Sequence, residues 1–284
     1  MCRLFGFRSV IQSAVHRSLV DADNALAVQS NQHRDGWGVA WYLAGAPHLI
    51  KGVSPAMEDK IFDRVSGVVA SETVLAHLRL ATAGDVNILN AHPFQYGRWV
   101  FAHNGKIADF DRHKPMLRRE VAPALSRFIL GDTDSEILFY LFLSELSRRA
   151  DLHRKGVAMA DIVASLREIV ALVRERCDPG AEEPSLLTFV VTDGLTMVGL
   201  KEGKPLLFST YKERCADRDV CPFLADACEA PTTDGHVNHL IISSEPLQGE
   251  NEWISLDDGE VVGVDWRMVL HRGTLADGVT RVGG

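Results

Sequence analysis

Cysteine stands directly after the first methionine of the chain, at position 2. Its side chain is small enough for that methionine to be trimmed, which would leave a thiol and a free α-amine on one residue. An unperturbed α-amine titrates near about 7.7–8.0 and a free thiol near about 8.5, so the amine is matched as a base for the thiol around neutral pH. Cys2 is therefore a candidate N-terminal nucleophile, a residue that carries its own general base. The alternative is a half-buried cysteine in a first strand, because free cysteines are commonly buried.

Arg79 is a second candidate, at the end of a strand predicted over residues 74–80. Because side chains alternate along a strand, His77 and Arg79 share one face, opposite the apolar side chains. The simplest interpretation of such an arginine is a solvated charge. At a strand end, followed by Thr82 and Gly84, its guanidinium can also hold a carboxylate through two hydrogen bonds.

Two further sites combine turn and helix signals with useful chemistry. Asn104 and Gly105 follow a short strand predicted over residues 99–103, and an Asn-Gly pair is first of all a turn signal. The same pair also offers an amide NH₂ beside a backbone N–H, two donors for a developing oxyanion. Asp134 lies in the first turn of a predicted helix, where the helix dipole favours an acid. Its carboxylate is open to a structural role or to binding a substrate ammonium.

The elements that must position these residues alternate between strand and helix patterns. Thr133 and Glu136 have the capping-box spacing ahead of the apolar run 137–146, and an apolar stripe predicts a second helix over residues 157–177. A Pro- and Gly-containing break at 178–184 separates these helices from the strands that follow. The remaining predictions are a short helix over residues 19–28 and strands over 4–10, 38–43, 186–192, 196–200, 205–210, 240–243 and 261–264.

Strand-rich stretches on both sides of central helices predict two sheets packed face to face, with helices outside. No linker is evident, so we expect one domain over residues 1–284, with a polar loop insertion around 212–239. Zinc binding by that segment is an alternative, although its spacings match none of the usual paired zinc patterns, and we expect neither metal nor cofactor. The residues concerned are Cys215, Cys221, Cys228, His236 and His239.

Composition excludes several classes of partner. With 38 acidic and 30 basic side chains the formal charge is −8, which disfavours nucleic acid and anionic membrane surfaces. No apolar run reaches the roughly 18–20 residues of a membrane span, and no secretory signal is evident. Five cysteines at scattered spacing form no disulfide framework and suit a reducing cytoplasm.

Six ordered sites together resemble the glutaminase domain of class II glutamine amidotransferases, which are N-terminal-nucleophile hydrolases. The sites are Cys2 and the segments 33–38, 77–82, 90–93, 103–105 and 133–136. The resemblance is dense over the first half of the chain and continues more weakly through residues 243–246 and Trp253. It implies an α+β fold, a four-layer αββα sandwich of two mainly antiparallel sheets with helices on both outer faces.

The resemblance also implies a mechanism. Cys2 would be the nucleophile with its freed α-amine as base, and Asn104 and Gly105 would form the oxyanion hole. Attack on the γ-amide carbonyl of a glutaminyl group would give a γ-glutamyl thioester. Ammonia or an amine would leave, and water would then release glutamate.

For substrate binding, the resemblance implies a two-charge site. Arg79 would pair with the α-carboxylate, helped by Thr82, and Asp134 would hold the α-ammonium. This agrees with the chemistry of a zwitterionic amino acid, whose head group needs one cation and one anion. The expected ligand is thus a small γ-glutamyl compound.

Large members of this family carry a synthase or sugar-isomerase domain after the glutaminase, and no such pattern follows about residue 180 here. The resemblance is therefore to stand-alone members, including γ-glutamyl amide hydrolases similar to that of ergothioneine biosynthesis. Either a separate synthase partner takes the ammonia, or the enzyme is simply a hydrolase. A non-catalytic protein that binds glutamine or regulates a synthase is the alternative from another functional class.

Overall fold

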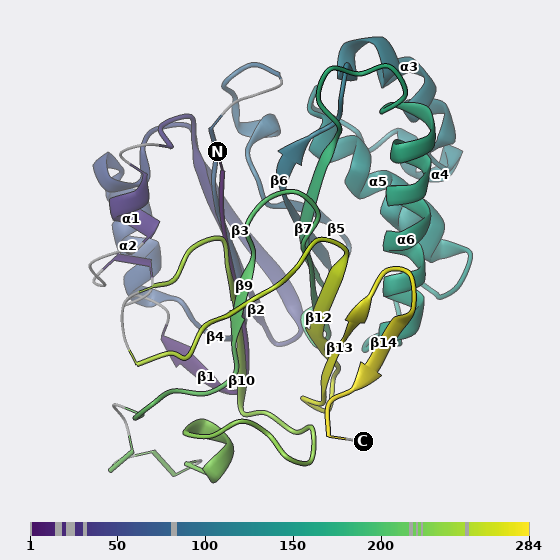
Figure 1. Cartoon of the computed structure of the whole chain (residues 1–284). Coiled ribbons are helices and arrows are strands. Elements are labelled where there is room, and N and C mark those ends of the chain that lie inside the picture. Colours follow the sequence, from purple (N-terminus) through teal and green to yellow (C-terminus); the bar gives the residue numbers. More distant parts are fainter. Residues whose placement is uncertain are drawn as a thin grey trace.

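The computed structural model describes residues 2–14, 19–20, 26–30, 33–80, 84–215, 218–219, 221–222, 224–247 and 250–283. Within these residues the chain forms two seven-stranded sheets, stacked on each other, with helices on the outside (Figure 1). Neighbouring strands pair antiparallel in both sheets. The αββα sandwich expected from the sequence is the observed fold.

The first sheet is built around β1 (Arg3–Ala14), which pairs with β4 (Ala70–Leu78) on one side and β10 (His239–Ser243) on the other. In this register Phe5 lies opposite Ala76 of β4 and Ser243 of β10, which places the start of the chain in the middle of the sheet. The strand order is β11 (Ile254–Ser255), β9 (Leu207–Ser209), β10 (His239–Ser243), β1 (Arg3–Ala14), β4 (Ala70–Leu78), β2 (Trp37–Leu43) and β3 (Ala46–Gly52).

The second sheet is built around β7 (Leu186–Thr192), which pairs with β6 (Trp99–Lys106) and β8 (Met197–Leu200). Asn104 of β6 lies opposite Thr188 of β7. Its edge strand β5 lies beyond β6, so β3 and β5 are edge strands of the two sheets. The strand order is β14 (Gly278–Arg281), β13 (Leu270–Thr274), β12 (Glu260–Val264), β8 (Met197–Leu200), β7 (Leu186–Thr192), β6 (Trp99–Lys106) and β5 (Phe94–Tyr96).

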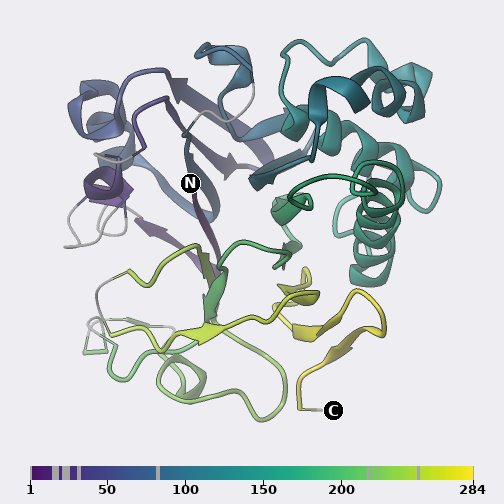
Figure 2. The ribbon, with the colours of Figure 1, turned by 45° about the horizontal axis from the view of Figure 1, so that its top comes forward.

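Helices cover both outer faces, as Figures 1 and 2 show. The first sheet is covered by α1 (Leu26–Gln29) and α2 (Lys60–Val68), and the second by α3 (Phe110–Glu120), α4 (Pro123–Ser126), α5 (Asp134–Ser147) and α6 (Met159–Arg176). Single 3₁₀ turns are η2 (Ala56–Glu58), η3 (Ile88–Asn90) and η4 (Asp226–Cys228).

Three apolar clusters hold these layers together. One joins α1 and α2 to the first sheet through side chains such as Phe62 and Phe5, and another joins α5 and α6 to the second sheet through Phe139 and Phe101. The third lies between the sheets, which approach closely at Gly6. A Cβ added there would lie 3.1 Å from the Met197 sulfur. Burial of these apolar surfaces is the main force that fixes the sheets face to face.

Several predicted elements match the structure closely, including β7, β2, α5 and α6. The helix predicted over residues 19–28 is only partly observed, as α1, because residues 21–25 lie outside the described part of the chain. The turn signal at Asn104-Gly105 is wrong as a strand end, since β6 continues to Lys106. Because Asn104 and Gly105 both pair with residues of β7, they continue the strand instead of forming a turn.

Among the described residues of the segment 212–239, helix and strand are limited to η4 and to His239, where β10 begins. An Asn238 amide donates to the Cys228 sulfur at 2.9 Å. Among the described residues, no cluster of three or more His, Cys, Asp or Glu side chains could hold a metal ion. Within the same residues no helix is both long and apolar enough to cross a bilayer.

Candidate active site

Cys2 lies at the entrance to β1, beside the end of β4. Its sulfur accepts a hydrogen bond from the Leu80 N–H at 3.4 Å and lies 3.5 Å from the Leu80 carbonyl oxygen. Burial raises the pKa of the Cys2 thiol above its ordinary value, while the Leu80 backbone and the charge of Arg79 act to lower it. Because the thiol is protonated at neutral pH in this setting, nucleophilic attack requires a base next to it.

Arg79 follows β4 directly and is buried, so the interpretation as a solvated charge is wrong. Its guanidinium donates to the Gly84 and Asp85 carbonyls, each at 3.1 Å. Its backbone is held by Asp35 and Gly36, whose N–H and C=O groups bond to the Arg79 C=O and N–H at 3.1 and 2.8 Å. The segment 33–38, whose role the sequence leaves unassigned, thus positions the arginine.

Thr82, the predicted helper of Arg79, lies in the segment 81–83, outside the described residues.

Asp134 is the first residue of α5 and is only 3% exposed. One carboxylate oxygen accepts from the Ile107 N–H at 2.8 Å and the other from the Ser135 N–H at 2.8 Å. Burial lowers the pKa of Arg79 and raises that of Cys2, and the negative charge of Asp134 acts to raise both. The Asp134 carboxylate is therefore close enough to act electrostatically on the guanidinium and on the thiol.

Asn104 and Gly105 come from β6 of the other sheet. The Asn104 side chain is buried and makes no hydrogen bond within the described residues. Gly105 has no room for a side chain, since an added Cβ would lie 1.8 Å from the Leu186 carbonyl oxygen of β7. The glycine is required by the close approach of these two strands rather than by a turn.

The candidate residues thus come from three elements of the fold. Cys2 and Arg79 lie where β1 begins beside the end of β4, Asn104 and Gly105 lie at the end of β6, and Asp134 lies at the start of α5. β1 and β4 both pack against β6, so the two sheets meet at this end of the sandwich (Figure 2). The charge of Asp134 acts on both Cys2 and Arg79, and these two residues also act on each other's pKa. Asn104 lies near the end of β6, three residues before Ile107, whose N–H donates to the Asp134 carboxylate.

Four histidines from the segments that carry the resemblance are buried. The His77 and His92 rings stack with centroids 4.1 Å apart, and neither ring has a hydrogen-bond partner within the described residues. Burial lowers the pKa of His77 to about 3 and that of His33 to about 4, so both are neutral at neutral pH. His103 is held by the Ser135 hydroxyl and the Leu186 carbonyl, at 2.9 and 2.8 Å. These contacts fix the His103 ring between α5 and β7.

Glu136 departs from its predicted role. Thr133 caps α5 by accepting from the Glu136 N–H, but the Glu136 side chain does not return to Thr133 as a capping box requires. Its two oxygens accept instead from the Leu130 and Gly131 N–H groups, at 3.0 and 2.7 Å. The glutamate therefore fixes the segment that leads into Asp134.

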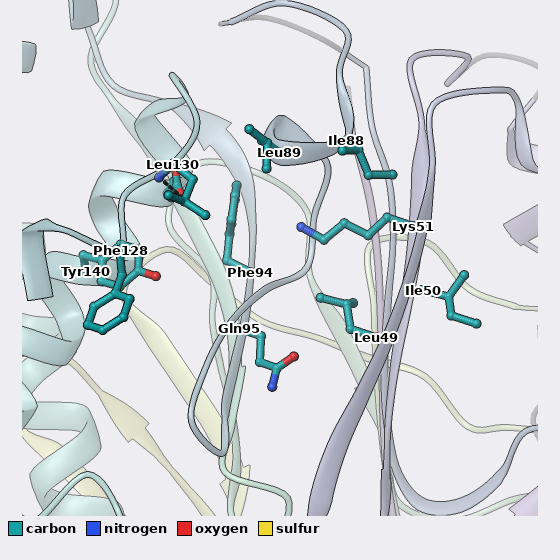
Figure 3. A pocket seen from close by; sticks show the side chains of 11 residues that line it. Leu49, Ile50, Lys51, Ile88, Leu89, Phe94, Gln95, Phe128, Leu130 and Tyr140 are labelled. Atoms are coloured by element: carbon teal, nitrogen blue, oxygen red, sulfur yellow. Dashed lines mark hydrogen bonds between the residues drawn. The ribbon is translucent and has the colours of Figure 1, made fainter.

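Sequence reasoning missed a pocket of about 570 Å³ between edge strands β3 and β5, lined in part by Glu136. Lys51 reaches into it from β3, toward Phe94 and Leu89 (Figure 3). Its ammonium donates to the Ala91 carbonyl at 2.5 Å, and burial lowers the pKa of Lys51 to about 8. A single lysine in an edge strand gives no sequence signal that predicts a pocket.

Comparison with known proteins gives the family of this chain. A family model described as class II glutamine amidotransferases matches residues 1–276. The chain belongs to this family, and is an enzyme that acts on carbon–nitrogen amide bonds, as expected. The predicted resemblance to its glutaminase and γ-glutamyl hydrolase members is confirmed.

Among curated relatives, the probable glutamine amidotransferase DUG3 of Saccharomyces cerevisiae is 34% identical over 258 residues, which cover 83% of this chain and 71% of that protein. The γ-glutamyl-hercynylcysteine sulfoxide hydrolase of Mycobacterium tuberculosis is 32% identical over 117 residues, 38% of this chain and 50% of that protein. A class II domain protein from Silicibacter pomeroyi has the same fold, with a TM-score of 0.63 at 21% identity and coverage of 99% and 97%.

Proposed function

We propose that this enzyme hydrolyses the γ-glutamyl amide bond of glutamine or of a γ-glutamyl conjugate, through a thioester on Cys2. The observation that supports this most directly is the placement of the Cys2 sulfur against the strand end that carries Arg79, with Asp134 acting on both. The substrate is a small molecule. The hydrolase relative is named for a γ-glutamyl conjugate, which extends the candidate substrates beyond free glutamine.

Arg79 and Asp134 bind the two charges of the glutamyl head group. A guanidinium anchored on two carbonyls keeps its fork geometry, which matches a carboxylate. The Asp134 carboxylate, in turn, is held by backbone N–H groups and keeps lone pairs for an ammonium. Thr82 contributes to the same end of the substrate.

The chemistry begins after removal of Met1. The freed α-amine takes the thiol proton, the sulfur attacks the γ-carbonyl carbon, and Asn104 with Gly105 donates to the oxyanion that forms. Collapse of this intermediate breaks the C–N bond, and the amine returns the proton to the leaving nitrogen. Water then attacks the thioester, which releases glutamate and restores the thiol.

The proposal allows two fates for the ammonia or amine that leaves. In simple hydrolysis this product diffuses away, and with a separate synthase partner it is transferred to that partner's substrate. Some structural neighbours are longer chains, such as a glutamine phosphoribosylpyrophosphate amidotransferase from Bacillus subtilis, of which this chain covers 49%. At 14% identity that likeness concerns the fold alone.

The test uses protein whose intact mass shows that Met1 has been removed. We expect glutamate release from glutamine or from γ-glutamyl-p-nitroanilide, and acid quenching should trap a covalent adduct with the mass of one glutamyl acyl group. Cys2→Ala should abolish both signals, whereas Cys215→Ala, which changes another partly exposed cysteine, should retain them. Equal turnover by the Cys2→Ala protein, or no turnover by the trimmed protein, would refute the proposal and favour a binding or regulatory role.

A further inference from the structure

Asn90 joins two segments that approach the candidate site from different parts of the chain. It ends η3, is fully buried, and uses both atoms of its side-chain amide. Its oxygen accepts from the Asp132 N–H at 2.9 Å, and its nitrogen donates to the Asp85 carbonyl at 3.0 Å. Because one partner can only donate and the other can only accept, the orientation of the amide is fixed.

On one side, this amide supports Arg79. The Asp85 carbonyl that Asn90 holds is one of the two carbonyls that accept from the Arg79 guanidinium, the other being Gly84. Loss of the Asn90 donor would free that carbonyl to shift. The Arg79 guanidinium would then lose a fixed hydrogen-bond acceptor, the Asp85 carbonyl.

On the other side, the amide supports Asp134. Asp132 lies two residues before it, in a short segment whose N–H groups at Leu130 and Gly131 are held by Glu136. Thr133 caps α5 at the next position. With these bonds in place, fixing the Asp132 N–H also fixes where α5 begins.

Two glycines leave room for this bridge. At Gly84, where φ is +69°, an added Cβ would lie 2.8 Å from the Asn90 amide nitrogen. At Gly131 it would lie 2.4 Å from the Asn90 amide oxygen. Neither position tolerates a larger residue while the amide stays in place, so both segments are shaped around the Asn90 side chain.

We propose that Asn90 is a positioning residue that sets the separation between Arg79 and Asp134, and thereby makes the site select an intact α-amino acid head group. The proposal rests on the assignment of these two residues to the glutamyl carboxylate and ammonium. A fixed separation lets both contacts form at once, so each strengthens the other. Without it, a ligand satisfies one contact at a time.

The experiment measures binding by calorimetry in the inert Cys2→Ala protein, with three ligands. Glutamine carries both charges, glutaramate lacks the α-amine, and 4-aminobutanamide lacks the α-carboxylate. In Asn90→Leu the side chain keeps its approximate size and adds no charge, but it can neither accept from Asp132 nor donate to Asp85. We expect glutamine to bind about 10- to 100-fold more weakly, with the two single-charge ligands changed by less than about 2-fold.

A matched control separates positioning from general stability. Ser144 is another buried side chain that bridges two segments, accepting from the Ala122 N–H at 2.9 Å and donating to the Tyr140 carbonyl at 2.7 Å. We expect Ser144→Ala to lower the melting temperature without changing the relative affinities of the three ligands. In the active enzyme, Asn90→Leu should raise KM for glutamine and leave the pH profile of kcat in place.

The outcomes distinguish this inference from the proposed function. Equal losses for all three ligands, or no loss for glutamine, would overturn the positioning role alone. If the Cys2→Ala protein with Asn90 intact binds neither glutamine nor glutamate, the proposed function fails and the role of Asn90 fails with it.

Discussion

At the scale of single residues, the charged side chains of Arg79 and Asp134 are both hydrogen-bonded to backbone groups. Arg79 donates to two carbonyls, and Asp134 accepts from two backbone N–H groups. Buried charges must be hydrogen-bonded to remain charged, and backbone groups achieve this without neutralising them. Both side chains therefore keep their charge for a ligand of complementary charge.

Arg79→Lys tests the need for a planar fork. A lysine ammonium is a point charge and cannot reproduce two parallel bonds to a carboxylate while also holding two carbonyls. We expect kcat/KM for glutamine to fall about 100-fold, mostly through KM, since roughly 3 kcal/mol separates a bidentate charged pair from a single contact. Steady-state kinetics measure this. Arg174→Lys, at an arginine paired with Asp178 and Glu202, serves as the control and should retain activity.

Asn104→Ala tests the oxyanion role. The Asn104 side chain makes no bond within the described residues, so its loss leaves no protein group newly unpaired. We expect kcat to fall about 10²- to 10³-fold with KM within a few-fold, as when a single oxyanion donor is removed. Asn238→Ala, which removes an amide at Cys228, should leave kcat intact. A larger change in KM than in kcat would contradict the assignment.

At the scale of elements, the predictions succeed where local pattern decides and fail where strand pairing decides. The stripe of α6 and the cap of α5 are local signals, and both elements are observed within about two residues of the predicted bounds. Asn104-Gly105 has an equally local turn signal, yet pairing with β7 overrides it. The edge strand β3 and helix α3, with its internal Pro115, carry mixed patterns and were not predicted.

Gly105→Ala tests the close contact between β6 and β7. Its added Cβ would meet the Leu186 carbonyl, a backbone atom that moves only if the strands separate. We expect a loss of about 1–3 kcal/mol in the free energy of unfolding, and loss of turnover because Asn104 moves with its strand. Chemical denaturation and kinetics check both. Gly199→Ala, where the nearest atoms are side-chain ends of Ile242 and Leu206, should cost less and stay active.

At the scale of the whole molecule, the site exists only because the two sheets are stacked. Cys2 and Arg79 come from one sheet and Asn104 from the other, while Asp134 enters from the helical layer outside. The ordered motifs predicted which residues form the candidate site, and this assignment stays a prediction. They did not reveal the bridge by Asn90 or the pocket of Lys51, which depend on how loops meet in space. One domain over residues 1–284 and a loop insertion around 212–239 stay predictions.

The buried histidines predict how stability of the whole fold depends on pH. Burial lowers the pKa of His77 to about 3 in the folded protein, whereas an unfolded histidine titrates near about 6.5. Between these values the unfolded chain binds a proton that the folded chain does not. The contribution of His77 is therefore fully present above about pH 6.5 and is lost as the pH falls toward 3, by up to about 1.4 kcal/mol per pH unit.

His77→Phe removes this titration while keeping a ring that can stack on His92. We expect the free energy of unfolding, measured by denaturant titration at several pH values, to decline less steeply below pH about 6.5 than in the parent protein. The same exchange at His153, which is exposed, changes the residue type without touching the buried cluster. An unchanged slope in His77→Phe would mean that the His77 ring takes up its proton in the folded state, which would contradict the effect expected from its complete burial.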